Sequence, residues 1–444
     1  MSTVTAPVLR TDRSARKAAR IFNQDRLRWL DEAQSLGPFV RLRFGRFLSV
    51  WVLSDAETAH DVLIASAASW RRPPALMTPI RMAGGENLFT LPDRAWSGLQ
   101  PAVSPELRKR ALEPRLATLP ELVSAEMAAL PMETTIDLDQ AMARLTMIVA
   151  AWVLFGKHLD RSRADDLFQH ERAAIDWVGD RMGSALAPLP FASRALRAHR
   201  KAVLRFSQEI VDERLGRAGG GHDLLDALLE ARPNGRKLAL SELRSHVAGF
   251  FLAGTETTAA ALGWAMVHGH RNPAEWARLR EEPESASAFV AETLRLTPPA
   301  WGIPRAPVGP GVQLRIGGSL IPVRRHESIS IYIRGINRDP QIWSHPEEFI
   351  PDRHSHLTKE QERGLLPFGL GPRGCIGQHL ALSELVTALP VLASRGDIHI
   401  EGQAAEDPHF VLRVRGGLRG RFSKGTRDWK QTMSPITRAC SGTP

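Results

Sequence analysis

Apolar and polar positions along the chain follow two different periods. Residues 39–44 alternate apolar and basic side chains and residues 47–53 form a second β-rich run, which predicts two strands near the start. Segments rich in alanine and leucine with apolar residues at helical spacing predict helices over 145–155, 198–217, 223–231, 241–268, 273–280 and 285–296. Strands are expected again over 312–316, 328–333, 397–400 and 410–414. The pattern predicts a mainly α protein with a minor β-sheet region.

The segment 241–268 is expected to be one long helix of about 42 Å, at 1.5 Å per residue. Ser241 is expected to be its N-cap. Gly249 and the run Ala-Gly-Thr-Glu-Thr-Thr at 253–258 interrupt an otherwise apolar sequence, and each glycine costs up to about 1 kcal/mol relative to alanine. This run is either a tolerated kink or a groove where something flat lies against the backbone.

Residues 368–377 read Phe-Gly-Leu-Gly-Pro-Arg-Gly-Cys-Ile-Gly, which predicts an irregular loop before a helix that starts at Gln378. A thiolate at a helix N-terminus beside an arginine has a lowered pKa, so Cys375 is a candidate nucleophile or metal ligand. A lone cysteine also occurs as an inert core residue. The loop matches the dinucleotide pattern G-x-G-x-x-G, but a proline lies inside the match, so we reject that interpretation.

The composition is that of an ordinary globular protein, with 43% apolar and 24% charged residues in a chain of 444. Two cysteines, Cys375 and Cys440, cannot make a disulfide framework, which favours a reducing cytoplasmic location. No apolar stretch approaches the roughly 18–20 residues that span a bilayer, so we expect no membrane span. The first twenty residues are basic and lack the apolar region of a signal peptide.

The net charge of +10 comes from the two ends of the chain. Residues 1–46 carry ten basic and four acidic side chains, and residues 413–444 carry eight basic and one acidic. The remainder is therefore slightly acidic, which argues against binding of nucleic acid by the body of the protein. A basic end can bind nucleic acid or an anionic membrane, and more often it is a solvated tail.

Five short motifs occur in a characteristic order. The Cys375 loop reads Phe-x-x-Gly-x-Arg-x-Cys-x-Gly, and the other four motifs lie at 253–258 (Ala-Gly-Thr-Glu-Thr-Thr), 292–295 (Glu-Thr-Leu-Arg), 337–340 (Asn-Arg-Asp-Pro) and 349–353 (Phe-Ile-Pro-Asp-Arg). With these motifs the chain resembles the cytochrome P450 family over about residues 20–423. The resemblance implies the P450 fold, with a long central helix over the haem. It also implies a basic N-terminal segment (1–20), a single P450 domain (21–423) and a polar C-terminal tail (424–444).

The resemblance implies a haem b cofactor whose iron takes Cys375 as its axial ligand. A thiolate ligand pushes electron density onto the iron and favours O–O cleavage. Phe368 would pack on the thiolate side, and the loop glycines, Gly377 among them, would direct N–H groups at the sulfur.

Three residues are implied as ligands of the haem propionates: Arg373 in the loop, Arg305 and Trp96. Apart from the family, Arg305 would be an ordinary surface arginine and Trp96 a core residue. The family usually has an arginine four residues after this tryptophan, whereas this chain has Gln100, which brings no charge.

The resemblance gives Thr257 and Glu256 roles in proton delivery. The hydroxyl would hold oxygen and a water by hydrogen bonds, and the carboxylate would relay protons from solvent. Glu292, Arg295 and Arg353 are expected to form a buried ion-pair network with a structural role.

The implied activity is a monooxygenase that inserts one oxygen atom of O2 into a hydrophobic small molecule by hydroxylation or epoxidation, a reaction typical of secondary metabolism. No part of the chain is left for a fused reductase, so a separate ferredoxin or flavodoxin with its reductase would supply electrons. The basic residues 108–110 or Arg363 are candidates for docking this acidic partner. Two alternatives stay open: a non-catalytic haem-binding sensor, and atypical chemistry such as coupling, nitration or peroxide-driven oxidation.

Overall fold

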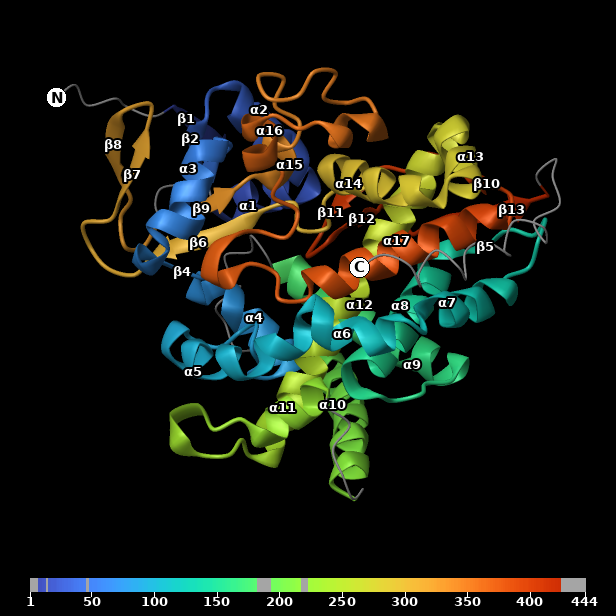
Figure 1. Cartoon of the computed structure of the whole chain (residues 1–444). Helices are drawn as coiled ribbons and strands as arrows, with labels where there is room; N and C mark the ends of the chain where they lie inside the picture. Colours follow the sequence, from blue (N-terminus) through green and yellow to red (C-terminus); the bar gives the residue numbers. More distant parts are fainter. Residues whose placement is uncertain (1–6, 13–14, 45–47, 182–192, 217–222, 425–444) are drawn as a thin grey trace.

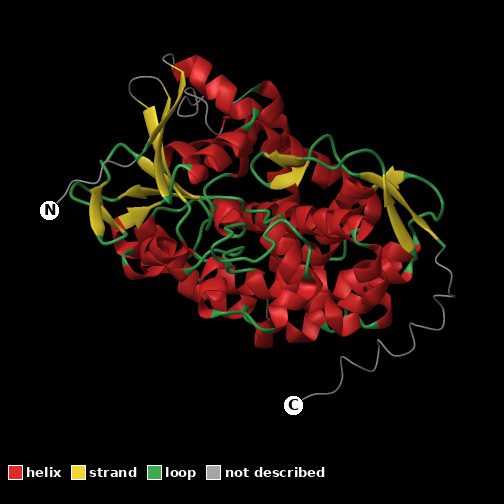
Figure 2. Cartoon of the chain, turned by 90° about the horizontal axis from the view of Figure 1, so that it is seen from above, coloured by secondary structure: helices red, strands yellow, loops and turns green. Residues whose placement is uncertain are grey.

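A computed structural model describes residues 7–12, 15–44, 48–181, 193–216 and 223–424 of the chain. Helices form the bulk of the molecule, and the strands gather at its periphery (Figures 1 and 2). The helices in this part of the chain are α1 (Ala15–Gln24), α2 (Arg26–Ser35), α3 (Ala56–His60), α4 (Pro74–Gly84), α5 (Asp93–Val103), α6 (Lys109–Leu116), α7 (Leu119–Ala128), α8 (Leu138–Phe155), α9 (Arg161–Arg181), α10 (Arg194–Leu215), α11 (Leu224–Glu230), α12 (Leu240–Arg271), α13 (Pro273–Glu281), α14 (Ala286–Leu296), α15 (Ile333–Ile336), α16 (Lys359–Gly364) and α17 (Gln378–Ser394).

The strands of the described residues form four sheets. The largest has six strands in the order β1 (Val8–Asp12), β2 (Phe39–Phe44), β3 (Leu48–Leu53), β9 (Ser328–Ile331), β6 (Ile303–Pro307) and β4 (Trp70–Arg71). The others are β10 (Asp397–Ile400), β13 (Arg419–Ser423) and β5 (Ile136–Asp137); β11 (Glu406–Pro408) with β12 (Leu412–Val414); and β7 (Gln313–Ile316) with β8 (Ser319–Pro322). Segments from both ends of the chain therefore meet in sheets around the helices.

The central element is α12, which packs against α8, α10, α14 and α17. Its apolar residues and those of α8 form one continuous core with α17. Among the described residues, α8 is the one helix long and apolar enough to cross a membrane by length and composition, and 78% of it is buried inside the protein. Such burial is the property of a core helix.

The predicted fold class is confirmed, and the predicted helices and strands are present with shifted ends. The expected Ser241 cap is wrong, because α12 begins at Leu240 and Glu242 accepts a hydrogen bond from the N–H of Ala239 at 2.7 Å. The expected strand 328–333 ends at Ile331, where α15 follows. Helices α1, α2, α4 to α7, α9, α15 and α16 were not predicted. Prolines lie inside α4, α5 and α6, and the many polar residues of α9 obscure its apolar period.

The basic N-terminal segment contributes to the fold. Strand β1 pairs with β2 in parallel, with Leu9 opposite Leu42. Part of the segment expected to be a solvated tail is thus the edge of the six-stranded sheet. The polar tail lies almost wholly in residues 425–444, outside the described residues.

The expected ion-pair network closes around Glu292 of α14. Its carboxylate lies 2.8 Å from Arg295 Nε, 3.0 Å from Arg353 Nε and 2.8 Å from His354 Nε2, and it accepts the N–H of Ile350 at 2.9 Å. Burial acts to raise the pKa of Glu292, but these hydrogen bonds and charges outweigh it and lower the pKa to about 2. The network fixes α14 to the 3₁₀ turn that carries Arg353.

We predict that Glu292→Gln lowers stability at pH 7 by about 3–5 kcal/mol, because it leaves buried cations without their partner. A depressed carboxylate pKa gives stability above the unfolded value of about 4.3, and this stability is lost as the pH falls towards 2. The difference in melting temperature between variant and wild type should therefore shrink below pH 4. Glu348→Gln, whose side chain is exposed, is the control, and equal losses in both variants would contradict the prediction.

Candidate haem site

The glycine-rich loop around Cys375 is held by its own backbone. The N–H of Cys375 donates to the carbonyl of Phe368 at 2.8 Å. Gly371 has a φ of +69°, and a Cβ at this position would overlap the carbonyl of Leu63, so glycine is required here. The loop presents Cys375 three residues before α17 begins.

The thiol of Cys375 combines two properties. The residue is accessible to solvent, and yet burial raises the pKa of its thiol, while the N–H of Gly377 lowers it. The side chain is therefore reached by solvent although protein atoms surround much of it. Ligation to a metal removes the thiol proton, so the raised pKa of the free thiol does not oppose a role as ligand.

The middle of α12 has an open face. Ala253 is exposed although Phe251 and Thr255 beside it are buried, and a methyl group added to Gly254 would meet no atom within 4 Å. Thr257 lies on the same face, with its hydroxyl donating to the Ala253 carbonyl at 2.7 Å. The helix continues unbroken through this run, and the open space at Gly254 is in line with the groove interpretation.

Three guanidinium groups gather around Arg373 of the Cys375 loop. Arg373 lies in the loop, and Arg72 and Arg305 lie at the adjacent strands β4 and β6. Burial, followed by the charges of Arg373 and Arg305, lowers the pKa of Arg72 to about 9. Burial, followed by the charge of Arg373, lowers the pKa of Arg305 to about 10.

Asp93 is the carboxylate that offsets these three charges. It pairs with Arg373, whose guanidinium also lies 4.2 Å from the ring centre of Trp96. Arg373 Nη1 is nevertheless buried without a hydrogen-bond partner among the described residues. One carboxylate for three clustered cations leaves a site that suits a dianionic ligand.

These features together fit a haem. Cys375 would supply a sulfur ligand for iron, the three arginines would suit two propionates, and the open face of α12 would lie against a flat ring. The family model for cytochrome P450 matches residues 27–409.

The chain is a cytochrome P450.

Similar proteins come from several bacteria. A Mycobacterium tuberculosis protein named as a cytochrome P450 is 28% identical over 405 residues, which cover 87% of this chain and 83% of that protein. Cyclooctat-9-en-7-ol 5-monooxygenase of Streptomyces melanosporofaciens is 31% identical over 290 residues, covering 59% of this chain and 61% of the relative. A crystal structure of a six-coordinated cytochrome P450 from Thermus thermophilus has a TM-score of 0.73 at 22% identity, covering 90% of this chain and 99% of that chain, which shows the shared fold.

The P450 family makes this protein an oxidoreductase of the haem-thiolate monooxygenase class. The structure brings the expected site residues together in two groups. Cys375, Phe368 and Gly377 share one loop. Arg373 and Trp96 contact each other, and Arg305 is close enough to Arg373 for that charge, after burial, to lower its pKa. Their contacts with the haem itself stay predictions.

Glu256 is not directed at the open face with Thr257. Its carboxylate is buried on the flank of α12, where Oε1 lies 3.2 Å from Arg172 Nη1 and 3.7 Å from Arg413 Nη1. Burial raises the pKa of Glu256, and these two arginines act against that rise. A direct contact between Glu256 and bound oxygen is therefore not supported, and any transfer of protons to Thr257 needs intervening water.

Sequence reasoning missed Arg72. It stands outside every motif, and only the pairing of β4 with β6 reveals its proximity to Arg305. Gln100 lies one turn after Trp96 on α5 and is half-buried, while Arg94 is exposed. Arg72 thus brings a third positive charge to Arg305 and Arg373, whereas Gln100 brings none.

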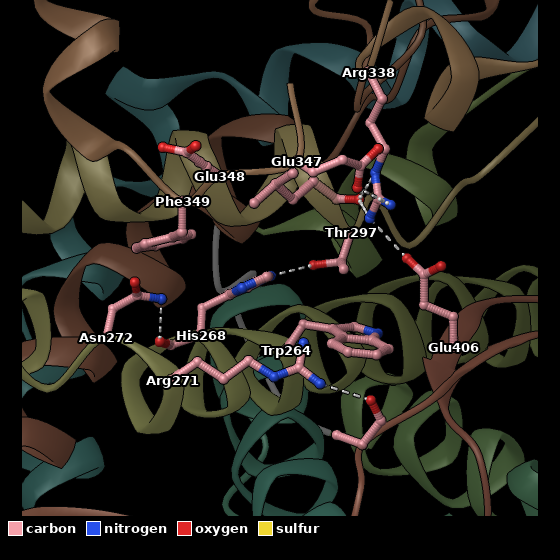
Figure 3. Close-up of a pocket in the computed structure, with 12 residues that line it drawn as sticks. Trp264, His268, Arg271, Asn272, Thr297, Arg338, Glu347, Glu348, Phe349 and Glu406 are labelled. Atoms are coloured by element: carbon pink, nitrogen blue, oxygen red, sulfur yellow. Dashed lines mark hydrogen bonds and ion pairs between the residues drawn. The ribbon is translucent and has the colours of Figure 1, made fainter. Parts of the chain in front are cut away.

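A separate polar pocket of about 560 Å³ lies at the C-terminal end of α12 (Figure 3). Several of its lining groups form hydrogen bonds with one another. His268 Nε2 lies 3.2 Å from the Thr297 hydroxyl, and Arg338 donates to Glu347 and Glu406 at 2.9 Å each. His268 is about 21 Å along the helix from Gly254. This pocket is distinct from the haem site.

We predict that Arg72→Gln weakens haem retention about tenfold, because a charge-assisted hydrogen bond contributes roughly 1.5–3 kcal/mol. The measurement is the rate of haem transfer to apomyoglobin. Adding Gln100→Arg to the variant should restore retention if total charge at the site is what matters. Arg94→Gln is the matched control, and wild-type retention in Arg72→Gln would contradict the assignment.

Proposed function

We propose that this P450 inserts one oxygen atom of O2 into a hydrophobic small molecule, with electrons from a separate ferredoxin or flavodoxin and its reductase. The observation that supports this best is the solvent-accessible thiol of Cys375, in the same loop as Arg373, which belongs to a cluster of three arginines that share one carboxylate. When bound, the haem iron with its thiolate ligand supplies the activation of O2.

The cofactor is proposed to be haem b. Covalent attachment of a c-type haem needs a C-x-x-C-H motif, and the loop has a single cysteine. Cys375 would ligate the iron, and the N–H of Gly377 would tune the sulfur by a hydrogen bond. Arg72, Arg305 and Arg373 would neutralise the propionates.

An apolar cluster supports a hydrophobic substrate. Met77 and Ile80 of α4, Ala174 and Val178 of α9, and Leu196 of α10 pack together, with Phe410 against them. Met77, Ile80 and Phe410 belong to segments that are substrate-facing in the family, and the residues of α9 and α10 pack behind them. The Streptomyces relative is named for oxidation of a small molecule, which is in line with a role of this chain in secondary metabolism.

Proton supply would depend on Thr257. Its hydroxyl is on the open face and its present acceptor is a carbonyl of its own helix, so rotation about χ1 frees it to hold a water or oxygen. Glu256 would contribute through water from the flank of the helix. Arg108, Lys109, Arg110 and Arg363 are all exposed, and they are proposed to dock the acidic electron donor in the cytoplasm.

The proposed function is tested by spectral titration with a panel of apolar compounds, since a substrate that displaces water from the iron shifts the spin state. The compound with the largest shift is then assayed for product in a reconstituted system with ferredoxin, reductase and NAD(P)H. Turnover with peroxide alone, or no turnover with any donor, would favour the atypical or sensor alternatives.

We predict that Cys375→Ser abolishes the thiolate signature in the absorption spectrum of the ferrous–CO complex, because the sulfur ligand is lost. Cys440→Ser should leave the signature intact. Retention of the signature in Cys375→Ser would refute the assignment of this residue as ligand.

We predict that Thr257→Ala lowers product per NAD(P)H about tenfold while NAD(P)H is still consumed, because proton placement by a positioned hydroxyl is lost. The missing equivalents should appear as hydrogen peroxide. Thr257→Ser keeps the hydroxyl and should retain most of the coupling. Equal coupling in wild type and Thr257→Ala would make Thr257 a structural residue only.

A further inference from the structure

An acid of α9 lies directly against the central helix. Glu171 Oε2 is 2.9 Å from the hydroxyl oxygen of Thr255 in α12. Both side chains are buried, with Glu171 3% and Thr255 0% exposed. Thr255 stands in the chain between Gly254 of the open face and Glu256, two residues before Thr257. A contact from α9 therefore reaches the functional segment of α12 from its buried side.

The hydroxyl of Thr255 has two oxygen partners and one hydrogen. Its oxygen lies 2.8 Å from the carbonyl of Phe251, one turn earlier in α12, and 2.9 Å from Glu171. A carbonyl only accepts, so the hydrogen towards Phe251 comes from the threonine, and the hydrogen towards Glu171 has to come from the carboxyl group. One hydrogen divided between both partners would leave two bent, weak bonds. The geometry therefore favours a protonated Glu171.

The surroundings of this contact are apolar. Phe155 of α8 and Phe206 of α10 pack on Phe251, with their ring centres 5.1 Å and 5.4 Å from its ring centre. Helix α9 packs against α4, α8 and α10 and contacts α12 through Glu171. Of the described residues on these elements, Glu256 of α12 is the one whose charge acts on the pKa of Glu171. Burial raises this pKa to about 8, the hydrogen bond with Thr255 acts against the rise, and the charge of Glu256 adds to it.

The neighbouring acid Glu256 has the opposite environment. Its carboxylate has Arg172 Nη1 at 3.2 Å and Arg413 Nη1 at 3.7 Å. Arg172 follows Glu171 in α9, yet its side chain is directed at Glu256, and Glu171 forms no ion pair with any described residue. Ionising two neighbouring buried carboxyl groups together is costly, so the proton resides on the one without cations. That group is Glu171.

The same face of α9 continues into an apolar cluster. Ala174 and Val178 belong to the cluster of α4, α9 and α10 that supports a hydrophobic substrate. They stand three and seven residues after Glu171, on one face of the helix. Because a helix is rigid over one or two turns, the contact at Thr255 on the buried side also fixes the direction in which Thr257 points on the open side.

We propose that Glu171 works as a neutral carboxylic acid whose hydrogen bond to Thr255 positions the open face of α12. It acts through Thr255 and does not contact the reacting atoms, so it is a positioning residue. Loss of its proton would remove the donor that holds Thr255 and would place a second buried carboxylate beside Glu256. The efficiency with which electrons yield product should therefore fall at alkaline pH. This effect on the reaction rests on the proposed function, whereas the protonation state of Glu171 does not.

The protonation state is tested by the melting temperature of the haem-loaded protein between pH 5 and 9. A carboxyl group with a raised folded pKa keeps its proton after the unfolded chain has lost it, so its cost to stability grows from about pH 4.3 to about pH 8. Glu171→Gln keeps a donor for Thr255 and cannot ionise.

We expect Glu171→Gln to melt above wild type at pH 8, by a margin that shrinks towards pH 5. Glu230→Gln, a substitution of an exposed acid of α11, is the matched control and should follow wild type at every pH. If Glu171→Gln melts below wild type at pH 8, or by a margin independent of pH, the native group is not a neutral donor and the proposal is overturned.

The positioning role is tested by product per NAD(P)H at pH 7 and pH 9, with the compound selected by spectral titration. Wild type should lose about fivefold between the two pH values, because roughly nine-tenths of a carboxyl group is ionised one unit above its pKa. Glu171→Gln should keep its pH 7 value at pH 9, and Glu171→Leu, which has no donor, should be low at both.

Substitutions of the partner residue keep the test decisive even if Glu171→Leu folds poorly. Thr255→Val removes the hydroxyl and should lower product per NAD(P)H at both pH values, whereas Thr255→Ser retains the hydroxyl and should behave as wild type. Wild-type values in Thr255→Val, or the same alkaline loss in Glu171→Gln as in wild type, would contradict the positioning role. Absence of turnover in wild type would overturn the proposed function, and the melting comparison would still decide whether Glu171 is neutral.

Discussion

A charge buried in a protein is costly unless opposite charge and hydrogen bonds surround it. Glu292 meets this condition fully, with Arg295, Arg353 and His354 around one carboxylate. Arg72, Arg305 and Arg373 do not meet it, since they share Asp93; burial, and then the charge of Arg373, lowers the pKa of both Arg72 and Arg305. The contrast separates structure from function. Networks with balanced charge stabilise the fold, and networks with unbalanced charge mark where a ligand binds or a proton passes.

The long helix α12 fixes the positions of these two kinds of site relative to each other. One face is packed into the core with α8 and α17, and its middle has an open face at Ala253, Gly254 and Thr257. Its flank carries Glu256 towards α9 and the β11–β12 hairpin. Because a helix is rigid over this length, the open face, the acid and the core contacts cannot move independently. Proton supply and cofactor placement are therefore properties of the same element.

Local sequence was enough for the features that depend on neighbours in the chain. The Cys375 loop, the open segment of α12 and the Glu292–Arg295 pair are all visible as short motifs, and the mainly α fold follows from apolar spacing. Features that depend on distant segments were not visible. Arg72 meets Arg305 only because β4 pairs with β6, and the direction of Glu256 depends on Arg172 and Arg413 from other elements.

The replacement of an expected arginine by Gln100 illustrates why motif reading has this limit. A motif ties a charge to one position, whereas the electrostatic potential at a partly buried site sums charges from every element within several ångströms. A dianionic ligand requires enough positive charge at its carboxylates, and it places little constraint on which strand or helix provides it. Arg72 follows a strand that is remote in sequence from Gln100, and the charges of Arg373 and Arg305 act, after burial, to lower its pKa, which places it in the same cluster. The loss of a motif residue therefore implies loss of function only when no other segment of the fold can bring the same charge to the same place.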